Sequence, residues 1–271
     1  DRIVTTEGHD APVLRIAQIT DTHLHADPDG CLLGLNTRHC LQRVIEHASQ
    51  RRPELVVASG DLTHDGSQQA YALARDCFNR MGVPVHCLPG NHDEAEMLKK
   101  CMNGNGYNSH TGIRINGWQL IFLDSSVAGS EGGHLSAAEL ENMAASLQQA
   151  SDLPTLIWLH HQPVAIGSRW LDTMAVDNPD DFFAVIDRHP QVRGIIWGHV
   201  HQVFDQQRNG VQLLSTPSTC IQFLPGSEDF AVEHIPPGYR WLDLYDDGHF
   251  TTGVERLPDI PGDIDQGARG Y

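Results

Sequence analysis

The sequence contains no long apolar run and has little positive charge. None of its stretches approaches the roughly 20 apolar residues that a membrane-spanning helix needs, so we expect no membrane partner. Its 18 Lys and Arg residues stand against 35 Asp and Glu, which gives a formal net charge of −17 at pH 7. Sequence-independent binding of nucleic acid depends on basic side chains that neutralise phosphates, so we also expect no nucleic-acid partner.

Cysteine is scarce and is not arranged in pairs. The six cysteines, at 31, 40, 77, 87, 101 and 220, form no C-x-x-C motif and no cluster typical of disulfides. The first residues, "DRIVTTEGHDAP", lack the apolar core of a signal peptide. Both features predict a reduced, cytoplasmic protein.

Repeats and low-complexity linkers are absent as well, and the length of 271 residues permits a sizeable core. We expect a single domain over residues 1–256 and a loose tail over 257–271, which is rich in Pro, Gly and Asp. The elements alternate, as in an α/β protein. Strands are predicted at 12–20, 53–59, 83–89, 117–126, 154–161 and 192–201; helices at 37–52, 67–82, 136–151 and 178–189; and C-terminal hairpins at 203–216 and 238–257.

Polar residues follow five of the predicted strands at the point where each strand ends. The motifs are "ITDTH" (19–23), "SGD" (59–61), "PGNHD" (89–93), "LHH" (159–161) and "GHVH" (198–201). Ligands of α/β proteins bind at such strand ends. In an extended segment, residues two apart point to the same side, so His199 and His201 are predicted to face one place. Carboxylates with imidazoles and no thiolate suit Fe, Mn, Zn or Co, and the motifs therefore predict a metal site.

The five motifs, in this order over about residues 14–202, resemble those of the calcineurin-like metallophosphoesterase family. The resemblance implies an αββα sandwich, in which two mixed β-sheets pack together between outer helices, and a two-metal site. The implied ligands of metal one are Asp21, His23, Asp61 and His201, and those of metal two are Asp61, Asn91, His160 and His199. Asp61 would bridge both ions. His92 corresponds to the catalytic histidine of the family, and His23, Asp61, Asn91 and His92 would contact the substrate.

Two cations about 3.5–4 Å apart hold the attacking and leaving oxygens of an in-line displacement and acidify a bridging water, so that a bridging hydroxide is the expected nucleophile. His92 would donate a proton to the leaving alkoxide, a contribution of roughly 10²–10⁴-fold. A histidine that only orients Asn91 is the alternative interpretation of His92. Fe with Fe or Mn is the expected metal pair, and Zn or Co also fits these ligands.

Further stretches resemble the bacterial class III cyclic nucleotide phosphodiesterase branch of that family: "ADPDGCLLGLNT", "GDLTHDGS", "GGHLSAAEL" and "STPSTCIQFLPGSEDF". This resemblance implies hydrolysis of 3′,5′-cyclic AMP to 5′-AMP by a protein whose partner is a small cyclic nucleotide. The alternatives are a glycerophosphodiesterase or broad-specificity phosphodiesterase of the same superfamily, and a metal-binding scaffold without activity. A monomer or a homodimer is expected, and "CIQFLP" and "FAVEHIPPGY" are candidates for a lid or a dimer surface.

Four further histidines lie close to these motifs. His161 follows a predicted ligand directly and is a candidate for substrate contact or ligand support. His25, His64 and His134 lie in loops, where solvated side chains are the expected interpretation. His64 also departs from the family pattern, in which an aspartate is expected directly after the threonine of "GDLTHDG".

Overall fold

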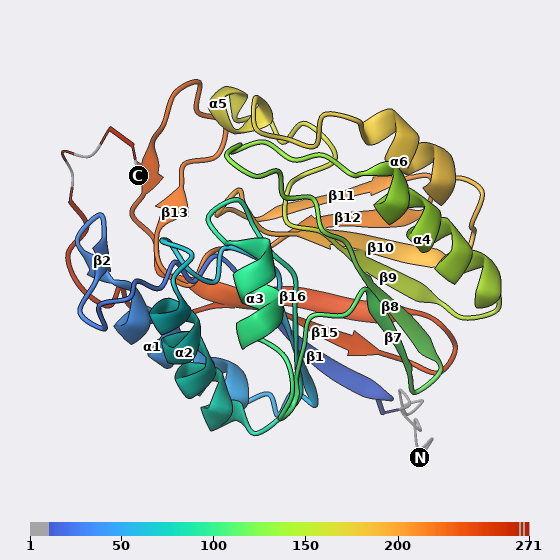
Figure 1. The fold of residues 1–271 in the computed structure, drawn as a ribbon, viewed down its shortest axis with the longest axis horizontal. Coiled ribbons are helices and arrows are strands. Elements are labelled where there is room, and N and C mark those ends of the chain that lie inside the picture. Colours follow the sequence, from blue (N-terminus) through green and yellow to red (C-terminus); the bar gives the residue numbers. More distant parts are fainter. Residues whose placement is uncertain (1–10, 266, 268, 271) are drawn as a thin grey trace, which may run out of the picture.

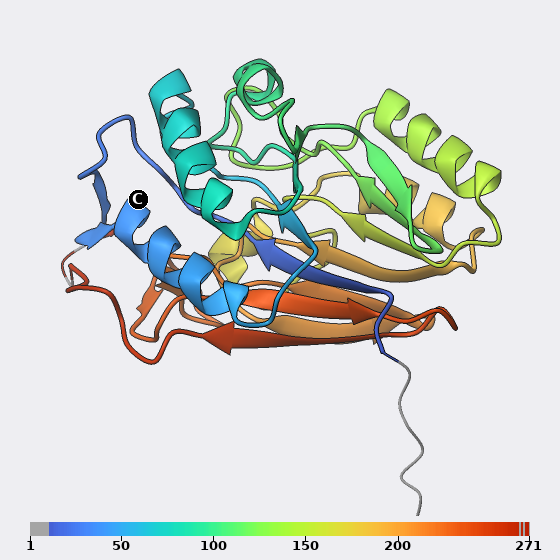
Figure 2. The same cartoon turned by 90° about the horizontal axis from the view of Figure 1, so that it is seen from below.

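The structure of the protein is a computed structural model that describes residues 11–265, 267, 269 and 270. Two six-stranded mixed sheets pack against each other, and helices flank them (Figures 1 and 2). The αββα architecture expected from the sequence is therefore confirmed.

The first sheet has the order β16-β15-β1-β4-β5-β6, and the second has the order β11-β12-β10-β9-β8-β7. The strands of the first sheet are β1 (Leu14–Ile19), β4 (Leu55–Ala58), β5 (Val85–Cys87), β6 (Tyr107–Asn108), β15 (Gly238–Leu244) and β16 (Phe250–Arg256). Those of the second are β7 (Gly112–Ile115), β8 (Trp118–Phe122), β9 (Thr155–Trp158), β10 (Val192–Trp197), β11 (Phe204–Arg208) and β12 (Val211–Ser215). Two short hairpin-like pairs complete the strands: β2 (Cys31–Leu32) with β3 (Leu35–Asn36), and β13 (Gln222–Phe223) with β14 (Val232–Glu233).

The helices divide between the two sheets. They are α1 (Thr37–Ser49), α2 (Gln68–Phe78), the 3₁₀ turn η1 (Asn79–Met81), α3 (Ala95–Cys101), α4 (Ala137–Gln149), α5 (Arg169–Asp172) and α6 (Pro179–Ile186). Figure 1 shows α1 and α2 beside the first sheet and α4 and α6 beside the second. The predicted helices begin where a side chain caps them: Asn36, Ser67 and Ser136 accept backbone N–H groups of α1, α2 and α4.

Alternation along the strands produces three apolar layers. In β1, Leu14 and Ile16 point between the two sheets, whereas Ala17 and Ile19 pack under α1 and α2. The second sheet repeats the pattern, because Trp158 of β9 lies between the sheets and the neighbouring Ile157 packs under the outer helices. Strands that are buried on both faces have continuous apolar sequences, and these strands could therefore be predicted from the sequence.

Some short elements were not predicted. Helix α3 has only seven residues and is capped by Glu94, whose carboxylate accepts the N–H groups of Glu96 and Met97. The division of the chain at residue 256 remains a prediction. Within the described part of the expected tail, Ile260 and Ile264 pack against the core, and Asp265 N donates to Leu33 O over 2.8 Å.

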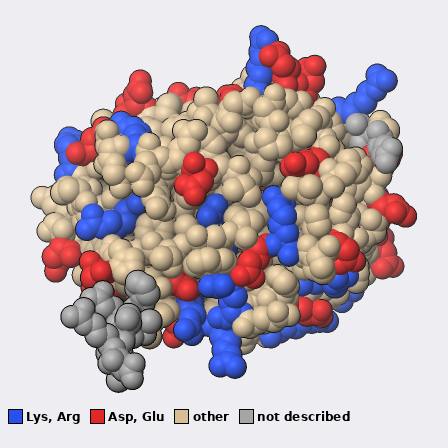
Figure 3. All heavy atoms as spheres, turned by 180° about the vertical axis from the view of Figure 1, so that it is seen from behind, with Lys and Arg blue, Asp and Glu red and all other residues tan. Residues whose placement is uncertain are grey.

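The surface carries charges of both signs, and the cysteines form no disulfide. Lys and Arg are interspersed with Asp and Glu over the face shown in Figure 3. All six cysteines are free thiols. In the described part of the chain, no helix combines the length and the apolar character that crossing a bilayer requires.

Candidate metal centre

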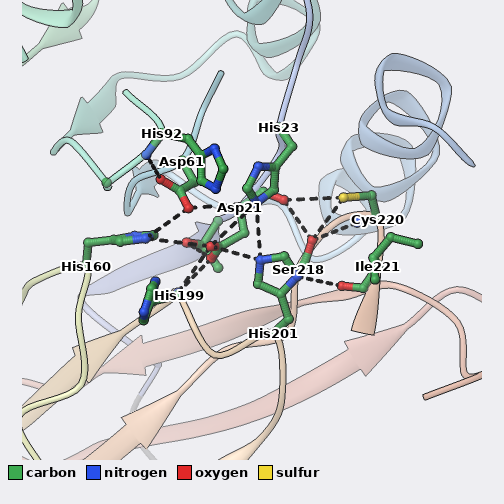
Figure 4. A network of polar contacts seen from close by, with 12 residues as sticks. Asp21, His23, Asp61, His92, His160, His199, His201, Ser218, Cys220 and Ile221 are labelled. Carbon is green, nitrogen blue, oxygen red and sulfur yellow. Dashed lines mark hydrogen bonds and ion pairs between the residues drawn. The ribbon is translucent and has the colours of Figure 1, made fainter. Parts of the chain in front are cut away.

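The five polar motifs meet at one place, beyond the ends of five strands from both sheets. Asp21 and His23 follow β1, Asp61 follows β4, Asn91 and His92 follow β5, His160 follows β9, and His199 and His201 follow β10. Figure 4 shows the two aspartates among the histidine rings. The two carboxylates and the imidazoles of His23, His160, His199 and His201 are buried, whereas Asn91 and His92 are half-buried.

The side chains form two adjoining groups of donor atoms. Asp21, His23 and His201 make up the first group, and Nε2 of His201 lies 3.2 Å from Asp21 Oδ1 and 3.2 Å from His23 Nε2. Asp61, His160 and His199 make up the second, in which the donor atoms lie within 4.8 Å of one another. Asp61 Oδ2 is 3.2 Å from His160 Nε2 in its own group and 3.8 Å from His23 Nε2 in the first. Asp61 therefore stands between the groups, where a bridging ligand is expected.

Left-handed backbone brings these residues together. Asp21, His23, Asp61, His199 and His201 have φ angles of 54°, 46°, 49°, 66° and 46°. The prediction that His199 and His201 lie in an extended segment is therefore wrong, although both rings lie in the same site. The strand ends at Trp197, and the two rings belong to different donor groups. Left-handed conformations cost energy in residues other than glycine, and they collect at functional sites.

Glycines beside the site leave room for its side chains. A Cβ on Gly60, whose φ is 99°, would lie 2.3 Å from His160 Nδ1, and one on Gly90 would lie 2.2 Å from Asp61 Oδ1. These are the glycines of the "SGD" and "PGNHD" motifs. Any larger residue at these two positions would collide with His160 or Asp61.

Gly60→Ala is expected to displace the His160 ring and to lower both stability and metal retention. Backbone strain at such a position costs about 1–3 kcal/mol, and the clash with His160 adds to it. Gly106→Ala is a matched control, because Gly106 has a φ of 87° but no atom within 4 Å of an added Cβ. Thermal unfolding and metal analysis of both variants test the idea. Equal metal content in Gly60→Ala and wild type would contradict it.

Backbone carbonyl groups orient two of the imidazoles. His160 Nδ1 lies 2.8 Å from Ser59 O, and His201 Nδ1 lies 2.8 Å from Ile221 O. A carbonyl oxygen only accepts, so Nδ1 carries a proton in both rings and Nε2 faces the centre of the site. Metal-binding histidines are commonly held in this way.

Several donor atoms of the site are buried and have no hydrogen-bond partner among the described residues. These atoms are Asp61 Oδ2, Asn91 Oδ1, His160 Nε2, and both ring nitrogens of His199. Buried polar atoms without partners are rare and call for an explanation such as an unseen ion. All four residues belong to the ligand set expected for metal two. The residues present therefore fit a bound cation.

The electrostatics of the site also favour added positive charge. Burial alone would lower the pKa of His160, but the carboxylates of Asp61 and Asp21 raise it to about 10. Burial would raise the pKa of Asp61, but His160 holds it well below its usual range. Burial keeps the pKa of both His23 and His199 well below the usual range, so these rings are neutral. Ionised carboxylates beside neutral imidazoles form a donor set that suits divalent cations.

His92 lies at the edge of this centre. Its backbone N–H donates to Asp61 Oδ1 over 2.8 Å, and its ring lies edge-on to that of His23 with 4.9 Å between the centroids. The His92 ring also stacks on that of His64, at 4.6 Å and 19°. The half-buried ring is thus beside the donor groups without belonging to either of the two, as a proton donor to the substrate needs.

His64 is a residue whose part in the site the sequence did not reveal. It was expected to be a solvated loop residue, but it is half-buried and its Nδ1 lies 3.2 Å from Nδ1 of His23. A hydrogen bond between these nitrogens leaves His23 Nε2 facing the first donor group. The departure from the family pattern at this position was a signal that could have identified it.

His64→Ala is expected to weaken metal binding at the first donor group by about 10–100-fold, the usual cost of losing such a supporting contact. His64→Gln keeps an acceptor at this position and is expected to retain most of the affinity. Competition with a chelator, followed by metal analysis, measures the effect. His134→Ala is a suitable control, because His134 is exposed and pairs with Asp177. Unchanged affinity in His64→Ala would show that His23 needs no such support.

His161 lies behind the second donor group. Its Nδ1 is 2.8 Å from Ser125 Oγ, and its ring lies 4.7 Å from that of His199. Burial, together with the neighbouring His160, lowers the pKa of His161 to about 3, so the ring is neutral. This position suits support of the ligands better than contact with substrate. His134 is exposed, as expected, and His25 is partly buried against His64.

Comparison with known proteins decides the family. Residues 14–203 match the family model described as calcineurin-like phosphoesterase. The chain belongs to this family. The match spans all five motifs, and the family consists of metal-dependent hydrolases.

Three curated members of the family are similar to this phosphoesterase over nearly its whole length. The 3′,5′-cyclic adenosine monophosphate phosphodiesterase CpdA of Pseudomonas aeruginosa is 38% identical over 98% of each chain. The protein of the same name from Escherichia coli K12 is 39% identical over 95% of each chain. A 3′,5′-cyclic-nucleotide phosphodiesterase of Nostoc is 39% identical over 90% of this chain and 93% of its own.

Solved structures support the fold. A dimetal phosphatase from Danio rerio superposes with a TM-score of 0.65 at 15% identity, covering 87% of this chain and 94% of its own. The purple acid phosphatase PPD1 from yellow lupin gives a TM-score of 0.64 at 12% identity, covering 93% of this phosphoesterase and 52% of the lupin chain.

Proposed function

We propose that this phosphoesterase hydrolyses 3′,5′-cyclic AMP to 5′-AMP at a two-metal site. The observation that carries the proposal is the pair of buried donor groups with Asp61 between them. The substrate follows from the similarity to relatives that are named for cyclic AMP or cyclic nucleotide hydrolysis over almost their full length.

In this proposal the ligand sets are those expected from the motifs. Asp21, His23, Asp61 and His201 hold one ion, and Asp61, Asn91, His160 and His199 hold the other. Fe with Fe or Mn is the proposed pair, with Zn or Co as further candidates. When bound, such a pair supplies positive charge for the phosphate oxygens and an acidified water as nucleophile.

The protein side chains supply the remaining functions. Asn91 offers a neutral carbonyl oxygen, so the site stays cationic enough for a phosphodiester. His92 donates a proton to the leaving 3′ oxygen, and its position beside Asp61 and His23 allows it to face the phosphate. His23, Asp61, Asn91 and His92 together border the place where the phosphate binds. The Asp61 contact fixes the backbone of His92 beside the two donor groups.

The proposed setting is a cytoplasmic monomer or homodimer that acts on a small molecule. The net charge of −17 disfavours polyanionic partners. It leaves a monoanionic cyclic nucleotide as the better match to a site whose cations are enclosed by acidic protein.

Comparison of kcat/KM for cyclic AMP, cyclic GMP, glycerophosphocholine and 5′-AMP tests the substrate class. We expect cyclic AMP to be preferred and 5′-AMP to be bound as a product but hydrolysed poorly, because a monoester carries a second negative charge. A much higher kcat/KM for glycerophosphocholine, or rapid release of phosphate from 5′-AMP, would contradict the proposal. Metal-loaded protein that turns over none of these diesters would indicate a binding scaffold.

A further inference from the structure

A pocket of about 200 Å³ adjoins the predicted metal centre. Asn91 and His92 border it on the side of the metals, and Gly270 also borders it. The remaining lining side chains come from helix α5 and from loops: Trp170 from the helix, and Glu131, Met174 and Phe230 from loops. A substrate whose phosphate reaches Asn91 and His92 therefore has its other end against an aromatic and apolar wall.

Trp170, Phe223 and Phe230, here called the aromatic wall, lie against the metal centre. Phe223 is fully buried and stacks on the predicted ligand His201, with 4.2 Å between the centroids and 9° between the planes. Trp170 meets Phe223 edge-on at 5.0 Å and Phe230 edge-on at 5.3 Å. Phe223 thus lies between the Trp170 ring and the predicted ligand His201. Such edge-on contacts hold aromatic rings in defined orientations.

Two hydrogen bonds anchor the short helix that carries Trp170. Arg169 N donates to Ser227 O over 3.1 Å, and Gly226 N donates to Ser168 Oγ over 3.1 Å. These bonds join α5 to the loop that carries Phe230. The wall therefore has a fixed geometry before any ligand binds, which lowers the entropic cost of binding a flat ring.

Trp170 has an indole N–H that this arrangement leaves unused. Its Nε1 is buried, and among the described residues it has no hydrogen-bond partner. Buried tryptophan N–H groups usually find an acceptor. An acceptor on a bound molecule would satisfy it. The exposed carboxylate of Glu131, on the same pocket, offers an acceptor for a donor group of that molecule.

We infer that this pocket is the nucleobase site, in which Trp170 and Phe230 contact the purine ring. The Trp170 indole donates to a ring nitrogen, and Glu131 accepts from an exocyclic amino group. Adenine carries both groups. This inference rests on the proposed function, because it assumes that the phosphate lies at Asn91 and His92. It adds what the metal centre lacks, which is a means to choose among phosphodiesters.

The test compares cyclic AMP with ribose 3′,5′-cyclic phosphate, which has the same reacting group but no base. Trp170→Ala removes the ring contact and the N–H donor, so it is expected to lower kcat/KM for cyclic AMP by about 10- to 100-fold and to leave the abasic substrate unaffected. Trp170→Phe keeps a ring but loses the N–H, so a smaller loss of about 3- to 10-fold is expected. Phe250→Ala, which removes an aromatic ring packed on Trp118, is the control for general destabilisation.

Equal losses on both substrates in Trp170→Ala would assign Trp170 a structural role and overturn the inference, as would no loss on either. Binding of 5′-AMP and ribose 5-phosphate to metal-loaded protein separates this inference from the proposed function. If the wild type does not hydrolyse cyclic AMP, the proposed function fails. Tighter binding of 5′-AMP than of ribose 5-phosphate, lost in Trp170→Ala, would still establish the base site, and equal binding of the two would refute it.

Discussion

Asp61→Ala is expected to lose metal from both donor groups and to lower cyclic AMP turnover by more than the ~100-fold that changes outside the ligand set cost. Asp61 lies 3.2 Å from His160 in one group and 3.8 Å from His23 in the other, so its carboxylate is the shared negative charge of the site. Without it, the second donor group would keep no carboxylate, and only Asp21 would offset the charge of two cations. Elemental analysis of the purified variant measures the loss.

Asp61 also accepts the backbone N–H of His92, so folding of the variant must be checked. Asp61→Asn retains an acceptor for that N–H but removes the charge, and we expect the same loss of metal with less loss of stability. Asp152→Ala removes an exposed carboxylate and is the matched control. Two metal ions per chain in a folded Asp61→Ala or Asp61→Asn protein would contradict the assignment of Asp61 as a ligand of both ions.

His92→Ala is expected to keep both metal ions and to slow hydrolysis of cyclic AMP by about 10²-fold or more, as removal of a general acid does. The variant keeps the backbone N–H that Asp61 accepts, so the second donor group is not disturbed. The loss is expected to be smaller for bis(p-nitrophenyl) phosphate, because a nitrophenolate leaves without protonation. Turnover of both substrates, with metal analysis of the same samples, provides the measurement.

His110→Ala is the control for His92→Ala, since His110 is an exposed histidine outside the site. Equal losses on cyclic AMP and on the activated ester would mean that His92 positions the phosphate. Loss of metal from His92→Ala would instead support the alternative interpretation, in which His92 only orients Asn91.

Most of the fold was predictable because its strands are buried on both faces. Runs such as "LVVA" (55–58) and "LIWL" (156–159) are apolar at every position, and Asn-Gly at 116–117 and 209–210 marks two hairpins whose asparagines and glycines all have positive φ. Short elements carry no such signal. Helix α3 and the two-residue strands are formed by local caps and single contacts, which a periodic pattern cannot reveal.

For the site, the sequence predicted which residues meet but not how they do so. The motifs at strand ends located Asp21 and Asp61, because β1 and β4 are parallel neighbours whose carboxyl ends share one edge, and located His160 at the end of β9 in the other sheet. The left-handed backbone at His199 and His201 was not foreseen, because neither residue is a glycine. The carbonyl groups that orient the imidazoles belong to Ser59 and Ile221, and a backbone oxygen has no signature in the residue type.

The contacts of the aromatic wall could not be predicted from the sequence either. Phe223 lies in "CIQFLP", which was expected to be a lid or a dimer surface, but its ring is buried against His201. Trp170 lies in a helix of four residues and meets Phe223 only through the tertiary fold. Contacts between residues so far apart in the sequence depend on loop conformations, which short motifs do not encode.

The most direct test of a two-metal cyclic AMP phosphodiesterase is a metal titration of chelator-treated protein with cyclic AMP as substrate, followed by phosphorus NMR of the product. The two donor groups predict no turnover without metal, and activity that rises until two ions per chain are bound. The expected product is 5′-AMP, without adenosine or free phosphate. Full activity in protein that contains no metal, or saturation at a single ion per chain, would contradict the account.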